Sequence, residues 1–217
     1  MLRWLPENVS TFGDIDSMFR LIYYITTAVF VGVIATLIFF LIRYRFQEGR
    51  RAEYSHGNTT LEIVWTSATT LIVITLALIS LPQWNRIKAQ APPSDVVIQV
   101  TAKQFNWEIR YPGPDGTFGT DDDVGLDNDM HVPVNEVVVV RLTSKDVIHS
   151  FFVPNLRLKQ DALPGRFINV WFKATKVGTY EIPCAELCGF GHSGMLGHLI
   201  VETPEAYTQW LQEKYQQ

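Results

Sequence analysis

The stretch LIYYITTAVFVGVIATLIFFLI, residues 21–42, is largely apolar and carries no charge. A second stretch of the same kind, IVWTSATTLIVITLALISLPQW, covers residues 63–84. A helix needs about 20 apolar residues to cross a hydrocarbon core of roughly 30 Å. Helices buried in soluble domains seldom run this long without a polar face. The two stretches therefore predict a hairpin of two membrane-spanning helices over residues 21–84.

The charges around these stretches predict the orientation of the chain. The segment before the first stretch is acidic and lacks the basic flank of a cleaved signal peptide. The loop between the stretches contains several arginines: Arg43, Arg45, Arg50 and Arg51. Because loops rich in positive charge stay in the cytoplasm, this loop is expected there. Both termini, including an N-terminal tail over residues 1–20, are then expected on the periplasmic or extracellular side.

The remainder of the chain follows a pattern typical of β-structure. A polar segment with a Pro-Pro pair, residues 85–95, is predicted to be a linker. Beyond it, short segments rich in β-branched and aromatic residues recur at even spacing. In one of them, residues 168–173, every second side chain is expected to face the core, with Trp171 on the opposite face. Residues 96–217 therefore predict a β-sandwich or barrel that ends in a surface helix starting at Thr203 or Pro204.

Composition narrows the classes of partner and ligand. The chain of 217 residues has a net charge of −4, and no basic stripe suggests a nucleic-acid partner. The segment PGPDGTFGTDDDVGLDND, residues 112–129, is rich in turns and acidic residues. Carboxylates that would suit Ca²⁺ are those of Asp115, Asp121, Asp122 and Asp123. The spacing does not match an EF-hand loop, so a solvated hairpin loop is predicted there in place of a Ca²⁺ site.

Both cysteines of the chain lie in CAELCGFGHSGM, residues 184–195, together with a histidine and a methionine. A disulfide would close only a short loop and leave His192 and Met195 unexplained. Structural zinc seldom uses methionine, and a single blue copper needs only one cysteine. A pair of copper ions bridged by two thiolates would use every one of these soft ligands.

Either copper interpretation needs another histidine from outside this loop. His149, in KDVIHSFFVP, is the candidate because it sits at a strand end among apolar residues. An upstream histidine beside a late Cys–His–Met loop is the arrangement of cupredoxins. The other histidines are not expected to be ligands: His56 lies in the cytoplasmic loop, His131 borders the acidic segment, and His198 follows the Cys–His–Met loop.

Several segments resemble, in order, subunit II of haem–copper cytochrome c oxidases: LEIVWT, VIHSFFVP, LKQDALPGR and CAELCGFGHSGM. The resemblance covers nearly the whole chain and implies a membrane α plus all-β fold, with a two-helix hairpin followed by a periplasmic cupredoxin domain. It also implies a dinuclear copper A centre whose ligands are His149, Cys184, the backbone carbonyl of Glu186, Cys188, His192 and Met195.

The resemblance implies an electron-entry subunit. Copper A would accept electrons from cytochrome c and pass them to haem in subunit I, where O₂ is reduced to water and protons are pumped. The side chain of Glu186 resembles a ligand to Mg²⁺ or Mn²⁺ at the border with subunit I, and Glu62 resembles the glutamate at a proton-uptake entrance. The partners are then subunit I, the other oxidase subunits, membrane lipid, and cytochrome c or a cytochrome c domain of a neighbouring subunit.

The sequence departs from the family pattern at QFNWEIRYPG, residues 104–113. Where the family often has two tryptophans, this chain has Phe105 and Trp107, so both are candidates for electron entry. With only two cysteines there is no CxxCH motif, and no covalent haem is expected. The alternative interpretations are a nitrous oxide reductase-like copper A domain, which would lack these two spans, and a copper-delivery protein, which would carry Met/His-rich motifs.

Overall fold

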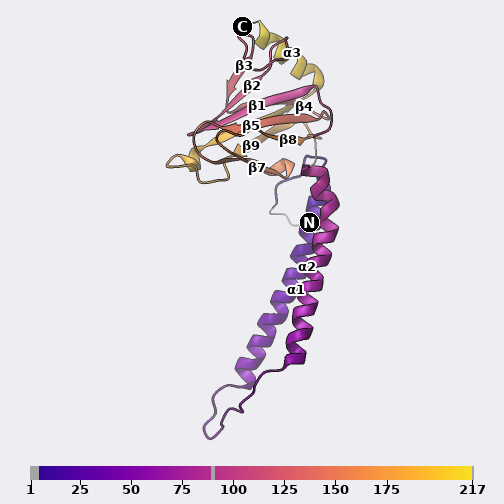
Figure 1. Ribbon diagram of the computed structural model, residues 1–217, viewed down its shortest axis with the longest axis vertical. Coiled ribbons are helices and arrows are strands. Elements are labelled where there is room, and N and C mark those ends of the chain that lie inside the picture. The colour runs from indigo at the N-terminus through magenta and orange to yellow at the C-terminus, as the bar shows by residue number, and fades with distance from the viewer. Residues whose placement is uncertain (1–4, 89–90, 217) are drawn as a thin grey trace. The chain divides into compact units, whose positions relative to one another are not determined.

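The computed structural model describes residues 5–88 and 91–216, and the chain divides into two compact units (Figure 1). One unit, Asp14–Arg86, contains two long helices, and the other joins the N-terminal segment up to Gly13 to the β-domain that follows Ile87. Residues 1–4 of the predicted tail and residues 89–90 of the predicted linker lie outside the described residues.

The helical unit consists of α1 (Gly13–Arg43) and α2 (Thr59–Lys88). Helix α1 begins before the predicted span, and Asp14 and Asp16 in its first turn suit the positive end of the helix dipole. Asn58 caps α2, where its Oδ1 accepts a hydrogen bond of 3.1 Å from the Leu61 backbone N–H. No described side chain of either helix is buried. Both helices are long and apolar enough to span a membrane.

The β-domain contains a five-stranded sheet in the order β3-β2-β1-β5-β8, a three-stranded sheet β4-β10-β9 and a two-stranded sheet β6-β7. The strands are β1 (Val96–Lys103), β2 (Asn106–Tyr111), β3 (Val124–Asp127), β4 (Asp129–Pro133), β5 (Val138–Ser144), β6 (His149–Val153), β7 (Leu158–Ala162), β8 (Ile168–Phe172), β9 (Gly178–Pro183) and β10 (Leu196–Glu202). Strand β1 pairs antiparallel with β2 and parallel with β5, so residues distant in sequence lie side by side.

The core lies between the sheets and follows the alternation expected of strands. On β1 the side chains of Ile98, Val100 and Ala102 are fully buried while their neighbours are half-buried. Trp107 of β2 is also fully buried, and its indole N–H donates a 3.1 Å hydrogen bond to the carbonyl of Ile182 on β9. This bond links the five-stranded sheet to the three-stranded one and satisfies the only polar atom of a large buried ring.

The N-terminal segment packs against the β-domain and changes which side chains of β8 are buried. Ser10 forms a β-bridge with Ala174, and the side chains of Val9 and Phe12 are buried. The ring of Phe12 meets Trp171 edge-on, with 5.1 Å between ring centroids. The prediction that residues 168–173 bury only one face is therefore wrong at Trp171, which is buried because the N-terminal segment covers the second face.

The acidic segment 112–129 is only partly a turn-rich loop, because its last third forms strand β3. Its aspartates support the loop's own turns. Asp115 accepts a hydrogen bond of 2.7 Å from the Thr117 backbone N–H, and Asp123 accepts one of 2.7 Å from that of Gly119. Strand β3 pairs with β2, so this segment extends the five-stranded sheet.

Helix α3 (Pro204–Tyr215) ends the described chain, and Thr203 is its N-cap, in agreement with the predicted start. Trp210 of this helix stacks on the ring of His131, with 4.2 Å between centroids. His131 also contacts a Glu202 carboxylate oxygen through its Nδ1 at 3.1 Å. The helix therefore covers the three-stranded sheet through an aromatic contact.

Gly197 on β10 provides a test of the close packing of this strand against Trp107 and the backbone of Asn128. A Cβ at Gly197 would lie 2.6 Å from the Asn128 carbonyl oxygen and 3.0 Å from Cδ1 of Trp107. We expect Gly197→Ala to lower the free energy of unfolding by about 1–3 kcal/mol, because neither the Asn128 backbone nor the buried Trp107 ring can move away without disturbing the core. Gly125→Ala on β3, where nothing lies within 4 Å of an added Cβ, is the matched control. Equal denaturant midpoints for the two variants would contradict this packing.

Candidate metal centre

The loop that joins β9 to β10 is held at both ends. The Cys184 backbone N–H donates a 3.0 Å hydrogen bond to the carbonyl of Met195, which closes the loop. The Ala185 backbone N–H bonds the Ser150 carbonyl at 3.0 Å, and Cys184 forms a β-bridge with Phe151 of β6. These bonds place the loop against the start of β6, where His149 lies.

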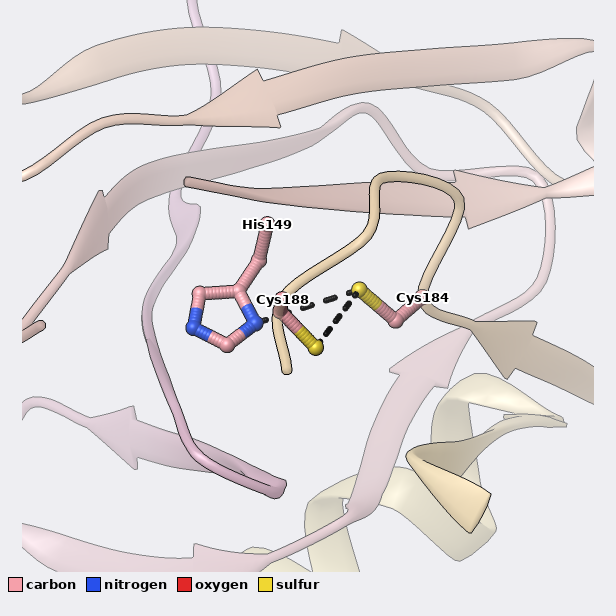
Figure 2. Close-up of side chains that lie close together, drawn as sticks. All are labelled: His149, Cys184 and Cys188. Atoms are coloured by element: carbon pink, nitrogen blue, oxygen red, sulfur yellow. Dashed lines mark hydrogen bonds between the residues drawn. The ribbon is translucent and has the colours of Figure 1, made fainter. Parts of the chain in front are cut away.

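Figure 2 shows how His149, Cys184 and Cys188 converge. The Sγ atom of Cys184 lies 3.8 Å from Nδ1 of His149 and 3.8 Å from Sγ of Cys188. One ligand atom from each of the three residues falls within 4.8 Å of the others. A disulfide requires about 2.05 Å between sulfurs, and both cysteines are free. The disulfide interpretation is therefore excluded in this structure.

The remaining predicted ligands surround the same two sulfurs. Sγ of Cys188 lies 3.5 Å from Nδ1 of His192 and 3.9 Å from Sδ of Met195. The carbonyl oxygen of Glu186 lies 3.3 Å from Sγ of Cys184. The structure thus brings together all of the predicted donors. Two thiols, two imidazoles and one thioether form a soft donor set that fits copper better than zinc or a hard cation.

The centre is buried, which affects the protonation of its thiols. His149 is fully buried and the side chains of Cys188 and Met195 are nearly so. Burial, together with the neighbouring thiol of Cys184, raises the pKa of Cys188 to about 11. The thiol is therefore protonated at neutral pH in the metal-free protein, and a metal ion would have to displace that proton on binding.

Asp146, which was not predicted from the sequence, contacts the predicted ligand His149. Its Oδ1 lies 2.8 Å from Nε2 of His149, on the opposite side of the ring from the sulfurs. Because a carboxylate oxygen only accepts hydrogen bonds, the Nε2–H of His149 is the donor in this contact, and Nδ1 is left facing Cys184. The signal in the sequence was an acidic residue three positions before the histidine in KDVIH.

The two candidate aromatic residues occupy different environments. Phe105 is 38% exposed, and its ring atoms lie so close to Gly191 that an added Cβ would approach Cδ2 to 2.5 Å. Trp107 is fully buried, and its ring lies edge-on to His149 with 6.3 Å between centroids. Phe105 therefore reaches the surface over the Cys–His–Met loop, whereas Trp107 supports the histidine from within the core.

The other singled-out residues lie outside this centre. His198 pairs with Asp129 at 3.0 Å, and His56 packs edge-on to Tyr54. The side chain of Glu186 turns from the sulfurs to Lys159, with 2.9 Å between Oε1 and Nζ. Glu62 lies in the first turn of α2, in the other unit of the chain.

Comparisons with known proteins identify relatives along the whole chain. The family model described as cytochrome c oxidase subunit II, transmembrane domain, matches residues 8–82, and the model for its periplasmic domain matches residues 112–203. The alternative cytochrome c oxidase subunit 2 of Bradyrhizobium diazoefficiens is 31% identical over 97% of this chain and 84% of its own length. Cytochrome c oxidase subunit 2 of Thermostichus vulcanus is 34% identical over 95% of this chain and 77% of its own length.

A solved structure agrees with these matches. The periplasmic domain of cytochrome oxidase subunit II of Bradyrhizobium japonicum aligns with a TM-score of 0.52 and 33% identity, covering 58% of this chain and 98% of that one. The matches favour an oxidase subunit over a nitrous oxide reductase-like domain or a copper-delivery protein. Together, the two family models and the relatives that match nearly the whole chain show that it belongs to the cytochrome c oxidase subunit II family.

Proposed function

We propose that this subunit is the point at which electrons enter its oxidase, through a copper A centre in the loop between β9 and β10. The observation that carries the proposal is the unbonded pair of sulfurs 3.8 Å apart, with imidazoles at 3.8 Å from Cys184 and 3.5 Å from Cys188. The ligand set would be the side chains of His149, Cys184, Cys188, His192 and Met195, with the Glu186 carbonyl. When bound, the copper pair supplies a one-electron carrier between cytochrome c and the haem of subunit I.

The surroundings of the centre suit fast electron transfer. Phe151 is fully buried and Trp107 packs edge-on against it, with 5.6 Å between ring centroids. Such a shell keeps water from the buried donors His149, Cys184, Cys188 and Met195, so few dipoles reorient when the charge of the centre changes. The loop bond from Cys184 to Met195 and the Asp146 bond to His149 hold the donors in place.

Phe105 is proposed as the contact for the electron donor. Its exposed ring lies against the glycines of the Cys–His–Met loop, while Trp107 has no surface to offer. Leu187 and Phe190 on the same loop are also strongly exposed. An apolar surface of this kind suits transient contact with a cytochrome c or a cytochrome c domain.

The proposed orientation in the membrane follows from the packing of the N-terminal segment against the β-domain. The N-terminal segment and the β-domain form one packed unit, so both are on the same side of the membrane. The arginine-rich loop lies between the other ends of the two helices, and its charge favours the cytoplasm. The copper domain is then periplasmic, in a bacterial inner membrane.

Two carboxylates are proposed to serve the neighbouring subunit I. The Glu186 side chain is 45% exposed and paired with Lys159, which leaves it accessible for a Mg²⁺ or Mn²⁺ ion at the border between subunits. Glu62 begins the membrane-spanning part of α2 on the side of the arginine-rich loop. A charged group there is costly in the bilayer unless a partner covers it, which supports a role in proton uptake.

The first prediction concerns the ligands. The purified full chain should bind two copper ions. Cys188→Ser should bind fewer than two, because one of the two thiolates that would bridge the copper ions is missing. Oxidation of cytochrome c by the assembled oxidase should fall in parallel. His198→Ala is the control, since this histidine lies outside the centre. Metal analysis that finds one copper or none in the wild-type chain, or full cytochrome c oxidation by Cys188→Ser, would refute the proposal.

The second prediction concerns electron entry. Phe105→Ala in the copper-loaded full chain should slow reduction by cytochrome c by about tenfold, the effect of losing roughly 1.4 kcal/mol at a contact hot spot. The copper spectrum should stay that of the wild type. Phe167→Ala, an exposed aromatic outside the loop, should react at the wild-type rate in the same stopped-flow experiment. A Phe105→Ala rate equal to that of Phe167→Ala would remove Phe105 from the route.

The third prediction distinguishes the proposed role of Glu62 from that of Glu186. The variant at each residue serves as the control for the other. In the assembled oxidase, Glu62→Gln should lower turnover and leave the Mn²⁺ EPR signal intact, because only proton uptake is affected. Glu186→Gln should remove the Mn²⁺ signal and retain copper, because the backbone carbonyl is unchanged. Unchanged turnover in Glu62→Gln, or an unchanged Mn²⁺ signal in Glu186→Gln, would exclude the respective role.

A further inference from the structure

The carboxylate of Asp146 is a junction of several hydrogen bonds beside the metal centre. Its Oδ1 accepts from Nε2 of His149 at 2.8 Å and from the Val147 backbone N–H at 2.6 Å. Its Oδ2 accepts from the backbone N–H of Gln104 at 2.7 Å. One oxygen therefore holds a predicted copper ligand and the other holds the turn between β1 and β2.

That turn is attached to the copper loop by a second route. The amide Nε2 of Gln104 donates a 2.5 Å hydrogen bond to the carbonyl of Cys188. A Cβ added to Gly189 would lie 2.6 Å from the same Nε2, so the absence of a side chain there permits the approach. Gly191 likewise leaves room for the Phe105 ring. The turn 104–105 is thus fixed to Asp146 on one side and to Cys188 on the other.

We propose that Asp146 is a positioning residue that holds the His149 ring and the Gln104–Phe105 turn in register. Phe105, the proposed contact for cytochrome c, and His149, the proposed copper ligand, are then held at a fixed distance from each other. That distance stays constant from one turnover to the next. The inference rests on the proposed copper function and assigns to this carboxylate a role that a surface charge alone would not have.

The chemistry of the carboxylate explains why an amide would not replace it. Both carboxylate oxygens accept hydrogen bonds, and here each faces an N–H donor. An asparagine side chain offers one oxygen and one NH₂ group, so in Asp146→Asn either His149 or Gln104 faces a donor. The variant also removes the negative charge that favours the oxidised, more positive state of a metal bound to His149.

The experiment uses the full chain, loaded with copper, and compares Asp146→Asn with Asp129→Asn. Asp129 is a matched control because it pairs with His198 at 3.0 Å, outside the centre. Asp146→Asn should weaken copper binding in a chelator competition by about 10–100-fold. It should also alter the EPR hyperfine pattern and raise the midpoint potential. Asp129→Asn should match the wild type in all of these.

If Asp146→Asn does not fold, Asp146→Glu, which keeps the charge but displaces both oxygens from their N–H partners, should show the same loss of copper affinity, and wild-type affinity in Asp146→Glu would overturn the inference. A further variant tests the second attachment of the turn, the bond from Gln104 to Cys188. Gln104→Ala leaves the Asp146–His149 bond in place but releases the turn from Cys188. It should retain wild-type copper affinity and EPR signal, yet accept electrons from cytochrome c more slowly. Wild-type electron uptake in Gln104→Ala would contradict the link between turn and loop.

The outcomes separate this inference from the proposed function. If the wild-type chain binds two coppers but Asp146→Asn shares the affinity, spectrum and potential of Asp129→Asn, Asp146 is not a positioning residue. A slower reaction with cytochrome c that disappears at high salt, with no spectral change, would make it a docking charge only, which also overturns the inference. A wild-type chain that binds no copper pair would overturn both.

Discussion

Two thiol groups that approach without bonding are the constraint on which the rest of the structure depends. The 3.8 Å between Cys184 and Cys188 is too long for a disulfide and suits two sulfurs that share the same metals. Keeping two buried thiols in this arrangement requires fixed backbone on both sides. The bond from Cys184 to Met195 closes the loop, and the bridge to Phe151 attaches it to β6.

The β-domain provides that fixed backbone through contacts between its sheets. Trp107 connects β2 to β9 and supports the ring of His149. Phe12 of the N-terminal segment covers Trp171, and helix α1 begins at the next residue, Gly13. The chain thus leaves the unit that contains the β-domain after Gly13 and returns to it at Ile87.

Much of the fold, and the set of side chains that the structure brings together around the two cysteines, could be predicted from the sequence because they depend on local patterns. Uncharged apolar runs predicted α1 and α2, and the crowded Cys–His–Met loop together with the family resemblance predicted the donors, His149 included. The features it missed depend on contacts across the fold. Trp171 is buried by a segment more than 150 residues away, and no periodicity within β8 could reveal that cover. Asp146 acquires its role only when β1, β2 and the start of β6 meet, so spacing in the sequence gave at most a hint.

Cys184 and Cys188 would hold two copper ions that share one unpaired electron. The most direct measurement is the EPR spectrum of the oxidised, copper-loaded full chain. Because a shared unpaired electron couples equally to two copper nuclei, we expect a seven-line hyperfine pattern. A four-line pattern from a single copper, or no copper signal, would contradict it.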